Sequence, residues 1–220
     1  GGMGLLGLCT DIIGIVNDKG LCIQAITLAH WLCKHGHYDN QTRFLGHVKT
    51  NENAPKFFER IDKMFEVGME KISPGVDLPQ VDEYHQLITV VPLLKELTEN
   101  HRTELQHCMA DQSPCYGNSK APSYNLLQRA TALMLNITSD ERLYSKKSSP
   151  DLILLLTELF VFLIESSQGP CKENQNVLVS SGIITVIQRI LKIKLVIETR
   201  TWEYFAGLKE PKKHSSTRSA

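Results

Sequence analysis

The sequence predicts an all-α protein built as an armadillo- or HEAT-like stack of helical hairpins. Apolar residues recur at spacings of three and four along most of the chain, and the alternation typical of a strand is sustained nowhere. Three similar phrases at 40–45, 100–106 and 173–178 each contain asparagine, follow one apolar helix and open another. Such corners, about 60–75 residues apart, indicate an α-solenoid.

The helical periodicity is clear enough to place each element. The clearest helix follows Pro55, which suits a first helical turn, and Pro92 should kink a later helix or mark a restart. The stretch 151–167 is apolar nearly all round and is therefore predicted to lie at the centre of the stack. Gly182 should separate the last two helices. We expect helices near 5–17, 20–35, 40–49, 54–72, 83–99, 101–110, 123–138, 151–167, 173–180 and 182–198.

Composition shifts divide the chain into four parts. An N-terminal helical segment at 1–72 is followed by a linker at 73–82, which is rich in proline, glycine and aspartate. A second helical domain spans 83–198. The polar tail at 199–220 is predicted to be disordered. The Gly-Gly-Met opening and the polar end are typical of an excerpt from a larger protein.

Charge and hydropathy narrow the partners. Lys plus Arg and Asp plus Glu both number 24, so nothing in the overall charge attracts the chain to nucleic acid or to an anionic membrane. The longest apolar run, at 153–164, is shorter than the ~20 residues that span a bilayer. No signal peptide precedes the first helix. We therefore expect no nucleic-acid partner and no membrane crossing by this chain.

The sequence contains no recognisable catalytic or metal-binding constellation. Six cysteines form no Cys-x-x-Cys pair and indicate a reducing compartment without disulfides. The histidines around His35 and His37 are interpreted as solvated loop residues. A phosphate-binding glycine loop, an EF-hand and a nucleophile elbow are all missing from the sequence. Basic residues are too scattered for an inositol phosphate site. We expect no enzyme activity and no cofactor.

The third corner, at 168–176, is predicted to be a rigid joint. Gly169 can adopt positive φ and end one helix, and Pro170 cannot continue it. Asn174 or Glu173 can accept bonds from the first amides of the next helix, as the corner asparagines generally should. Gln175 can bond carbonyls of the neighbouring turn. Such a joint either relays movement or only stabilises the fold.

These corners resemble the inositol trisphosphate receptor and ryanodine receptor family of intracellular calcium-release channels, in their cytosolic homology-associated helical region. In that family a helix ending in Glu-Asn-His, here Glu99, Asn100 and His101, precedes a Leu-Gln pair. A later helix runs into a Gln-Gly-Pro-Cys…Asn-Gln corner, here at 168–175. The resemblance covers roughly residues 10–195, and motifs at 11–58 look closest to the inositol trisphosphate branch. The short loop at 73–82 and the last 20 or so residues depart from the family.

The resemblance implies a function for the whole segment. It would be a regulatory segment on the cytoplasmic face of the endoplasmic reticulum, coupling ligand binding to the gate of an inositol-trisphosphate-gated channel without holding ligand or pore. Its partners would be other domains and subunits of a homotetrameric channel, with protein regulators. The residues expected to determine coupling are Asn100, His101, Gly169, Pro170, Asn174 and Gln175. A free-standing armadillo-like adaptor that binds a protein partner is the alternative.

Overall fold

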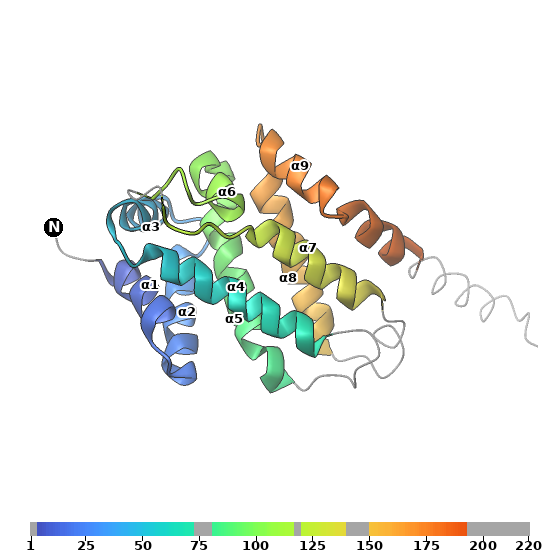
Figure 1. The fold of residues 1–220 in the computed structure, drawn as a ribbon, viewed down its shortest axis with the longest axis horizontal. Coiled ribbons are helices and arrows are strands. Elements are labelled where there is room, and N and C mark those ends of the chain that lie inside the picture. Colours follow the sequence, from blue (N-terminus) through green and yellow to red (C-terminus); the bar gives the residue numbers. More distant parts are fainter. Residues whose placement is uncertain (1–3, 73–80, 117–119, 140–149, 193–220) are drawn as a thin grey trace, which may run out of the picture.

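The computed structural model describes residues 4–72, 81–116, 120–139 and 150–192, and all regular structure within these ranges is helical (Figure 1). This confirms the predicted all-α class. The expected linker up to residue 80 and the expected disordered tail lie outside the described residues. The helices are α1 (Leu5–Ile15), α2 (Lys19–Cys33), α3 (Tyr38–Thr50), α4 (Ala54–Lys71), α5 (Val81–Thr98), a 3-10 turn η1 (Glu99–His101), α6 (Thr103–Ala110), α7 (Leu126–Ser139), α8 (Pro150–Ser167), α9 (Lys172–Ser180) and residues 183–192.

After α1, the helices follow one another in three sets, which we call units. Unit 1 is α2, α3 and α4; unit 2 is α5, α6 and α7; unit 3 is α8, α9 and residues 183–192. Helices at the same place in successive units contact each other: α2 packs on α5 and α5 on α8, α4 packs on α7, and α6 packs on α9. The chain therefore advances from the blue end to the orange end of an elongated molecule (Figure 1).

The predicted apolar face of 54–72 is buried. Phe57, Phe58, Ile61 and Phe65 of α4 are each 0–1% exposed. The rings of Phe57 and Phe58 meet edge to face, with 5.1 Å between their centroids, which is a favoured aromatic geometry. Burial of a whole helical stripe explains why its spacing of three and four was so regular in the sequence.

The centre of the molecule is α5, not α8 as the sequence suggested. α5 lies between α2 and α8. α8 buries one side against α5, but Ile153, Leu154 and Ile164 are 47–51% exposed on it. The prediction was wrong because an apolar circumference shows only that a helix can be covered on all sides, and within the described residues α8 has no neighbour beyond it.

Proline 92 does not end its helix. α5 runs without a break from Val81 to Thr98 with Pro92 inside. Of the two outcomes expected from the sequence, a restart is therefore wrong. Gly182, with φ of 97°, does separate α9 from the helix at 183–192, as predicted.

Candidate functional site

The second corner, between α5 and α6, is tied back to the turn between α2 and α3. Asn100 adopts a left-handed conformation with φ of 67° and donates from Nδ2 to the carbonyls of His35 and Gly36, each 3.1 Å away. Gly36 has φ of 61°, and a Cβ there would collide with the Asn100 amide. Both residues therefore hold conformations that suit glycine and asparagine.

Beside this turn lies a group of charged side chains. Glu96 is 3% exposed, accepts from the Gly36 amide at 3.3 Å and pairs with Lys95 at 3.0 Å. Burial acts to raise the pKa of Glu96, but hydrogen bonds from Lys95 and Glu99 and the charge of Lys95 outweigh it and lower this pKa. Burial, the bond to Glu96 and its negative charge raise the pKa of Glu99. Glu99 is thus the carboxyl that holds its proton to higher pH.

The amide of Gln41 joins unit 1 to unit 2. Gln41 lies in the first turn of α3, is 1% exposed and donates from Nε2 to the carbonyls of Glu96 and Glu99, both at 2.9 Å. These carbonyls belong to the last turn of α5 and to η1, where intrahelical partners run out. One buried amide therefore satisfies two helix-end acceptors and fixes α3 against the end of α5.

Gln106 repeats this arrangement between unit 2 and unit 3. It is fully buried in α6 and donates from Nε2 to the carbonyls of Glu165 at 2.7 Å and Gln168 at 3.2 Å, around the end of α8. Asn174 of α9 is also fully buried and donates to the carbonyls of Gln106 at 2.8 Å and Ser166 at 2.7 Å. α6, α8 and α9 thus meet in one network of amides and carbonyls.

The predicted capping role of the corner asparagines is wrong. The residues preceding α3, α6 and α9 are His37, Arg102 and Cys171, and none makes a side-chain cap bond. Asn174 lies three residues beyond Cys171, the residue at the cap position, and its side chain donates to the carbonyl of Ser166 in the preceding helix. Asn40 does the same, donating to the carbonyl of Leu32 at 2.5 Å. Asn40 and Asn174 each tie the start of one helix to the end of the helix before it.

Of the other residues expected to determine coupling, those of the third corner lie together, whereas His101 lies apart from the amide network. Gly169 has φ of 72°, as predicted, and Gln175 donates to the carbonyls of Ser167 at 3.0 Å and Gly169 at 3.3 Å. Pro170 is exposed in the same turn. His101 has φ of 57° and is exposed, and its ring has no hydrogen-bond partner among the described residues. The network above therefore includes Asn100 and Asn174 but not the His101 ring.

Sequence reasoning missed the two glutamines that join the units. Gln41 and Gln106 stood inside the recognised phrases but were not singled out. The available signal was their spacing: 65 residues separate Gln41 from Gln106, and 69 separate Gln106 from Gln175. It also missed the half-buried contact between α4 and α7, where Arg129 binds both carboxylate oxygens of Asp62 at 2.6 and 2.8 Å.

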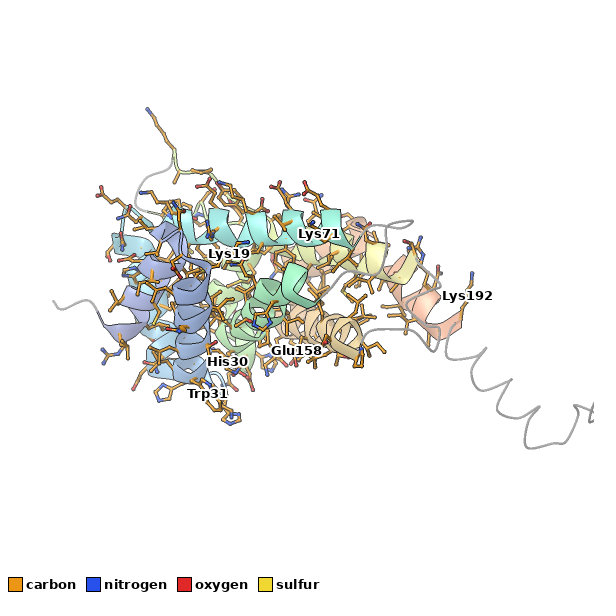
Figure 2. The ribbon with its side chains drawn as sticks, turned by 90° about the horizontal axis from the view of Figure 1, so that it is seen from below. Lys19, His30, Trp31, Lys71, Glu158 and Lys192 are labelled. Atoms are coloured by element: carbon orange, nitrogen blue, oxygen red, sulfur yellow. The ribbon has the colours of Figure 1, made fainter. Side chains whose placement is uncertain are left out.

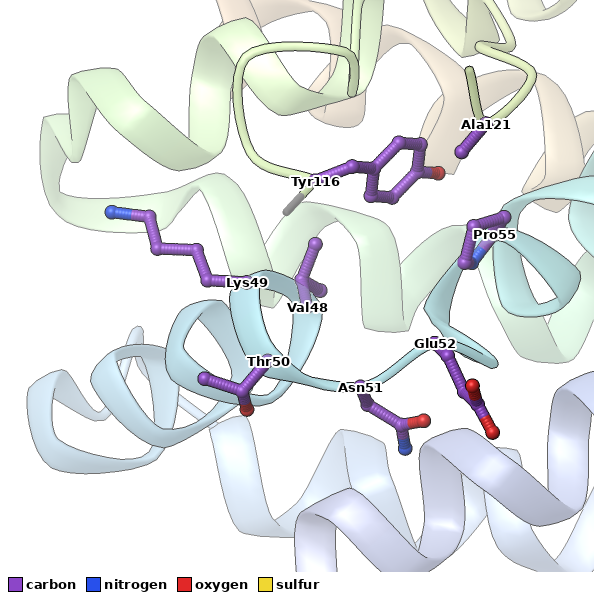
Figure 3. Close-up of a pocket in the computed structure, with 8 residues that line it drawn as sticks. All are labelled: Val48, Lys49, Thr50, Asn51, Glu52, Pro55, Tyr116 and Ala121. Carbon is purple, nitrogen blue, oxygen red and sulfur yellow. The ribbon is translucent and has the colours of Figure 1, made fainter. Parts of the chain in front are cut away.

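A pocket of about 210 Å³ lies where the turn between α3 and α4 faces the loop after α6 (Figure 3). Its one basic residue, Lys49, pairs with Glu104 at 3.1 Å. A phosphate-rich ligand needs several converging cations, which this lining lacks. The lining residues are Val48, Lys49, Thr50, Asn51, Glu52, Pro55, Tyr116 and Ala121.

In the parts of the chain that the structure describes, no three histidine, cysteine, aspartate or glutamate side chains are grouped to hold a metal ion. No helix described there combines the length and the apolar character that crossing a membrane requires. All six cysteines are free thiols, and five of them are buried. The most distinctive polar contacts among the described residues are those in which the side-chain amides of Gln41 and Gln106 bind carbonyls at helix ends, and we call these places joints.

The family of the chain follows from comparison with known proteins. The family model described as "RyR and IP3R Homology associated" matches residues 81–191, from the start of α5 through the helix at 183–192. No curated protein matches the chain. The match covers just over half of the sequence, and the chain belongs to this family. It is a channel-associated family of ryanodine and inositol trisphosphate receptors and not a known enzyme family.

Proposed function

We propose that the chain is a coupling segment on the cytosolic side of an inositol-trisphosphate-gated calcium-release channel of the endoplasmic reticulum. Its three units act as an armadillo-like stack that carries a ligand-induced movement toward the pore. Family membership supports the channel association. The observation that supports the coupling role is that one buried amide in unit 1 and one in unit 2 each bind the end of the next unit's first helix.

The bonds form a continuous connection along the molecule. Gln41 holds α3 against the end of α5, and Asn100 holds that end against the α2–α3 turn. Gln106 then holds α6 against α8, and Asn174 holds α9 against α6. Packed helices joined in this way move as rigid bodies, so a rotation applied at unit 1 displaces unit 3.

The partners of such a segment are other parts of the channel. The expected homotetramer would place other domains and subunits against the stack, with protein regulators on its remaining surface. In this proposal the residues named from the sequence act through structure, with Asn100 and Asn174 as the joints, Gly169 and Pro170 shaping the third corner, and Gln175 beside it.

The test uses a full-length inositol-trisphosphate-gated channel that carries this segment. Asn174→Ala removes both bonds of a buried amide. We expect nearly unchanged affinity for the ligand, measured by radioligand binding, and a lower open probability at saturating ligand, measured in single-channel recordings. Asn176→Ala is the matched control, since Asn176 is exposed two residues away.

Ligand binding and open probability together distinguish a loss of coupling from a loss of folding. Lost expression or lost ligand binding in Asn174→Ala alone would show only that the joint stabilises the fold. Wild-type gating in a well-expressed Asn174→Ala channel would contradict the coupling role.

A further inference from the structure

Two of the six cysteines lie against each other at the end of α6. Cys108 is in the last turn of that helix and is 0% exposed, whereas Cys115 is half-buried in the loop that follows. The Cys108 thiol donates a hydrogen bond to the Cys115 sulfur. Both are free thiols, so the structure holds the pair in its reduced form.

The fold of the loop after α6 keeps these two cysteines together. Gln112 is fully buried and donates from Nε2 to the carbonyls of Cys108 at 2.5 Å and Tyr124 at 2.8 Å. Its own carbonyl accepts from the amides of Cys115 at 2.8 Å and Tyr116 at 3.2 Å. One buried residue therefore binds both the turn that carries Cys108 and the turn that carries Cys115, and the backbone fixes their approach.

The surroundings of the pair favour a thiolate at Cys115. The hydrogen bond from Cys108 lowers the pKa of Cys115, and the positive charge of Lys49 lowers it further. Burial and the charges of Glu104 and Asp111 oppose this, but the pKa remains below its ordinary value. The same hydrogen bond and burial raise the pKa of Cys108. Because the thiolate is the nucleophile in thiol chemistry, Cys115 is the reactive member of the pair.

The other four cysteines lie in inert surroundings. Trp31 of α2 points outward (Figure 2), whereas both cysteines of that helix are 0% exposed. In all four, burial is the largest influence on the pKa of the thiol and raises it, which suppresses the thiolate. The four are Cys9, Cys22, Cys33 and Cys171, each 0–2% exposed.

We propose that Cys108 and Cys115 are a thiol–disulfide switch, which closes to a disulfide when the surrounding glutathione pool becomes oxidised. Cys115 is the attacking thiolate and Cys108 is the resolving thiol. The inference rests on the loop after α6 and goes beyond the proposed function, because it holds whatever the stack of units transmits.

The reaction with glutathione disulfide consists of two exchanges. In the first, the Cys115 thiolate attacks one sulfur of glutathione disulfide, which forms a mixed disulfide and releases one glutathione thiolate. In the second, the Cys108 sulfur attacks the Cys115 sulfur of this mixed disulfide. The second glutathione leaves and takes the proton of Cys108. Two protein thiols are thus oxidised to one disulfide, and one glutathione disulfide is reduced to two glutathione molecules.

The disulfide would form beside the contact between unit 1 and unit 2. Tyr116 follows Cys115 directly and is 9% exposed, and its ring centroid lies 6.3 Å from that of Phe58 in α4. Tyr116 also lines the pocket shared with Lys49 of α3 (Figure 3). Closing the bond ties the residue before Tyr116 to α6, so oxidation restrains the loop that packs against α4.

The test oxidises the full chain in buffers of increasing glutathione disulfide to glutathione ratio. Remaining thiols are blocked with N-ethylmaleimide, and tryptic peptides are mapped by mass spectrometry. Both cysteines fall in one tryptic peptide, residues 103–120. We expect this peptide to lose two hydrogens and to take up no N-ethylmaleimide, at a ratio about tenfold or more below that at which any other cysteine is oxidised.

Three variants assign the roles of the two thiols. Cys108→Ala removes the resolving thiol, so the peptide should retain one glutathione as a mixed disulfide at Cys115. Cys115→Ser should leave the peptide unoxidised, because Cys108 is buried. Cys171→Ser is the matched control: Cys171 occupies the cap position of α9, where serine is favoured, and this variant should close the Cys108–Cys115 bond as the wild type does.

Three outcomes would overturn the inference. One is a peptide 103–120 that keeps both thiols across the whole series. Another is a mixed disulfide that accumulates in the wild type without closing, which would mean that Cys108 does not reach Cys115. The third is oxidation of the four buried cysteines at the same ratio, as expected if the oxidant acts on the unfolded chain. Channel gating in Asn174→Ala affects none of these, so failure here is distinguishable from failure of the proposed function.

Discussion

Two joints in this molecule use the same chemical device in different surroundings. At the α3–α5 joint, Gln41 bridges two helix-end carbonyls beside Glu96 and Glu99. At the α6–α8 joint, Gln106 bridges two carbonyls beside Asn174, and every bond in that network runs from a neutral amide to a backbone carbonyl. The geometry of a joint is thus set by the amide, whereas its response to pH is set by what surrounds the amide.

An amide suits this task for a simple reason. The last carbonyls of a helix have no partner within it, and a side-chain NH₂ carries two N–H donors that can reach two of them. A carboxylate would repel the same oxygens, and a hydroxyl could reach only one.

The largest effect is expected at the uncharged joint. Gln106→Ala leaves the half-buried carbonyls of Glu165 and Gln168 without this partner and opens a cavity where the buried amide stood, so the free energy of unfolding should fall by about 3 kcal/mol. Urea denaturation followed by circular dichroism measures it. Gln175→Ala, the equivalent change at the exposed position, should stay within about 0.5 kcal/mol of the wild type.

Equal losses of unfolding free energy in Gln106→Ala and Gln175→Ala would contradict this contrast between a buried and an exposed amide. They would show that burial of the amide, which distinguishes Gln106 from Gln175, does not decide what a joint contributes.

The α3–α5 joint differs from the α6–α8 joint in its backbone, because Gly36 and Asn100 both have positive φ there. The second-largest loss of stability is expected from a change at this turn. Gly36→Ala places a methyl group against the Asn100 amide at φ of 61°, so we expect a loss of about 2 kcal/mol in unfolding free energy. Gly46→Ala is the control, because nothing lies within 4 Å of its added Cβ in the interior of α3. That change should stabilise the protein by up to about 1 kcal/mol. A neutral Gly36→Ala would show that the turn does not hold Asn100 in place.

Much of the fold could be predicted from the sequence, because periodicity and helix-end residues report local structure. The stripe on α4 and the positive φ at Gly169 were both predicted correctly. The position of α8 could not be predicted in this way, because an apolar sequence does not identify which helix packs against each of its sides. The family resemblance supplied the channel association, which residues alone would not have given.

The candidate site was predicted less well than the fold. Asparagine at a corner suggested an N-cap because that is its commonest local role. One observed partner of Asn174, the carbonyl of Ser166, lies eight residues back, but the other, the carbonyl of Gln106, lies on a helix 68 residues away. Long-range partners leave no local trace in one sequence. Only the recurrence of glutamine at Gln41, Gln106 and Gln175 pointed to them.

The smallest effect concerns pH and belongs to the charged joint alone. The pKa of Glu99 is raised by burial, by its bond to Glu96 and by that charge, while Lys95 lowers it and Glu165 raises it further. The folded state therefore keeps this proton to higher pH than the unfolded chain. The stability it contributes is present below the ordinary value of 4.5 and is lost as pH rises through the folded pKa. Because the pKa of Glu96 is lowered, its contribution is instead lost as pH falls below 4.5.

Glu99→Gln separates these two contributions. Glutamine can donate to Glu96 at every pH, so the variant should gain stability relative to the wild type as pH rises above 4.5 and match it below. Urea denaturation at several pH values measures the difference. Gln106→Ala is the control, and its penalty should be independent of pH because both bonds of the Gln106 amide run to backbone carbonyls. A Glu99→Gln difference that stays flat through this range would mean that the two carboxyls do not share a proton, and the contrast between the joints would then lie only in backbone geometry.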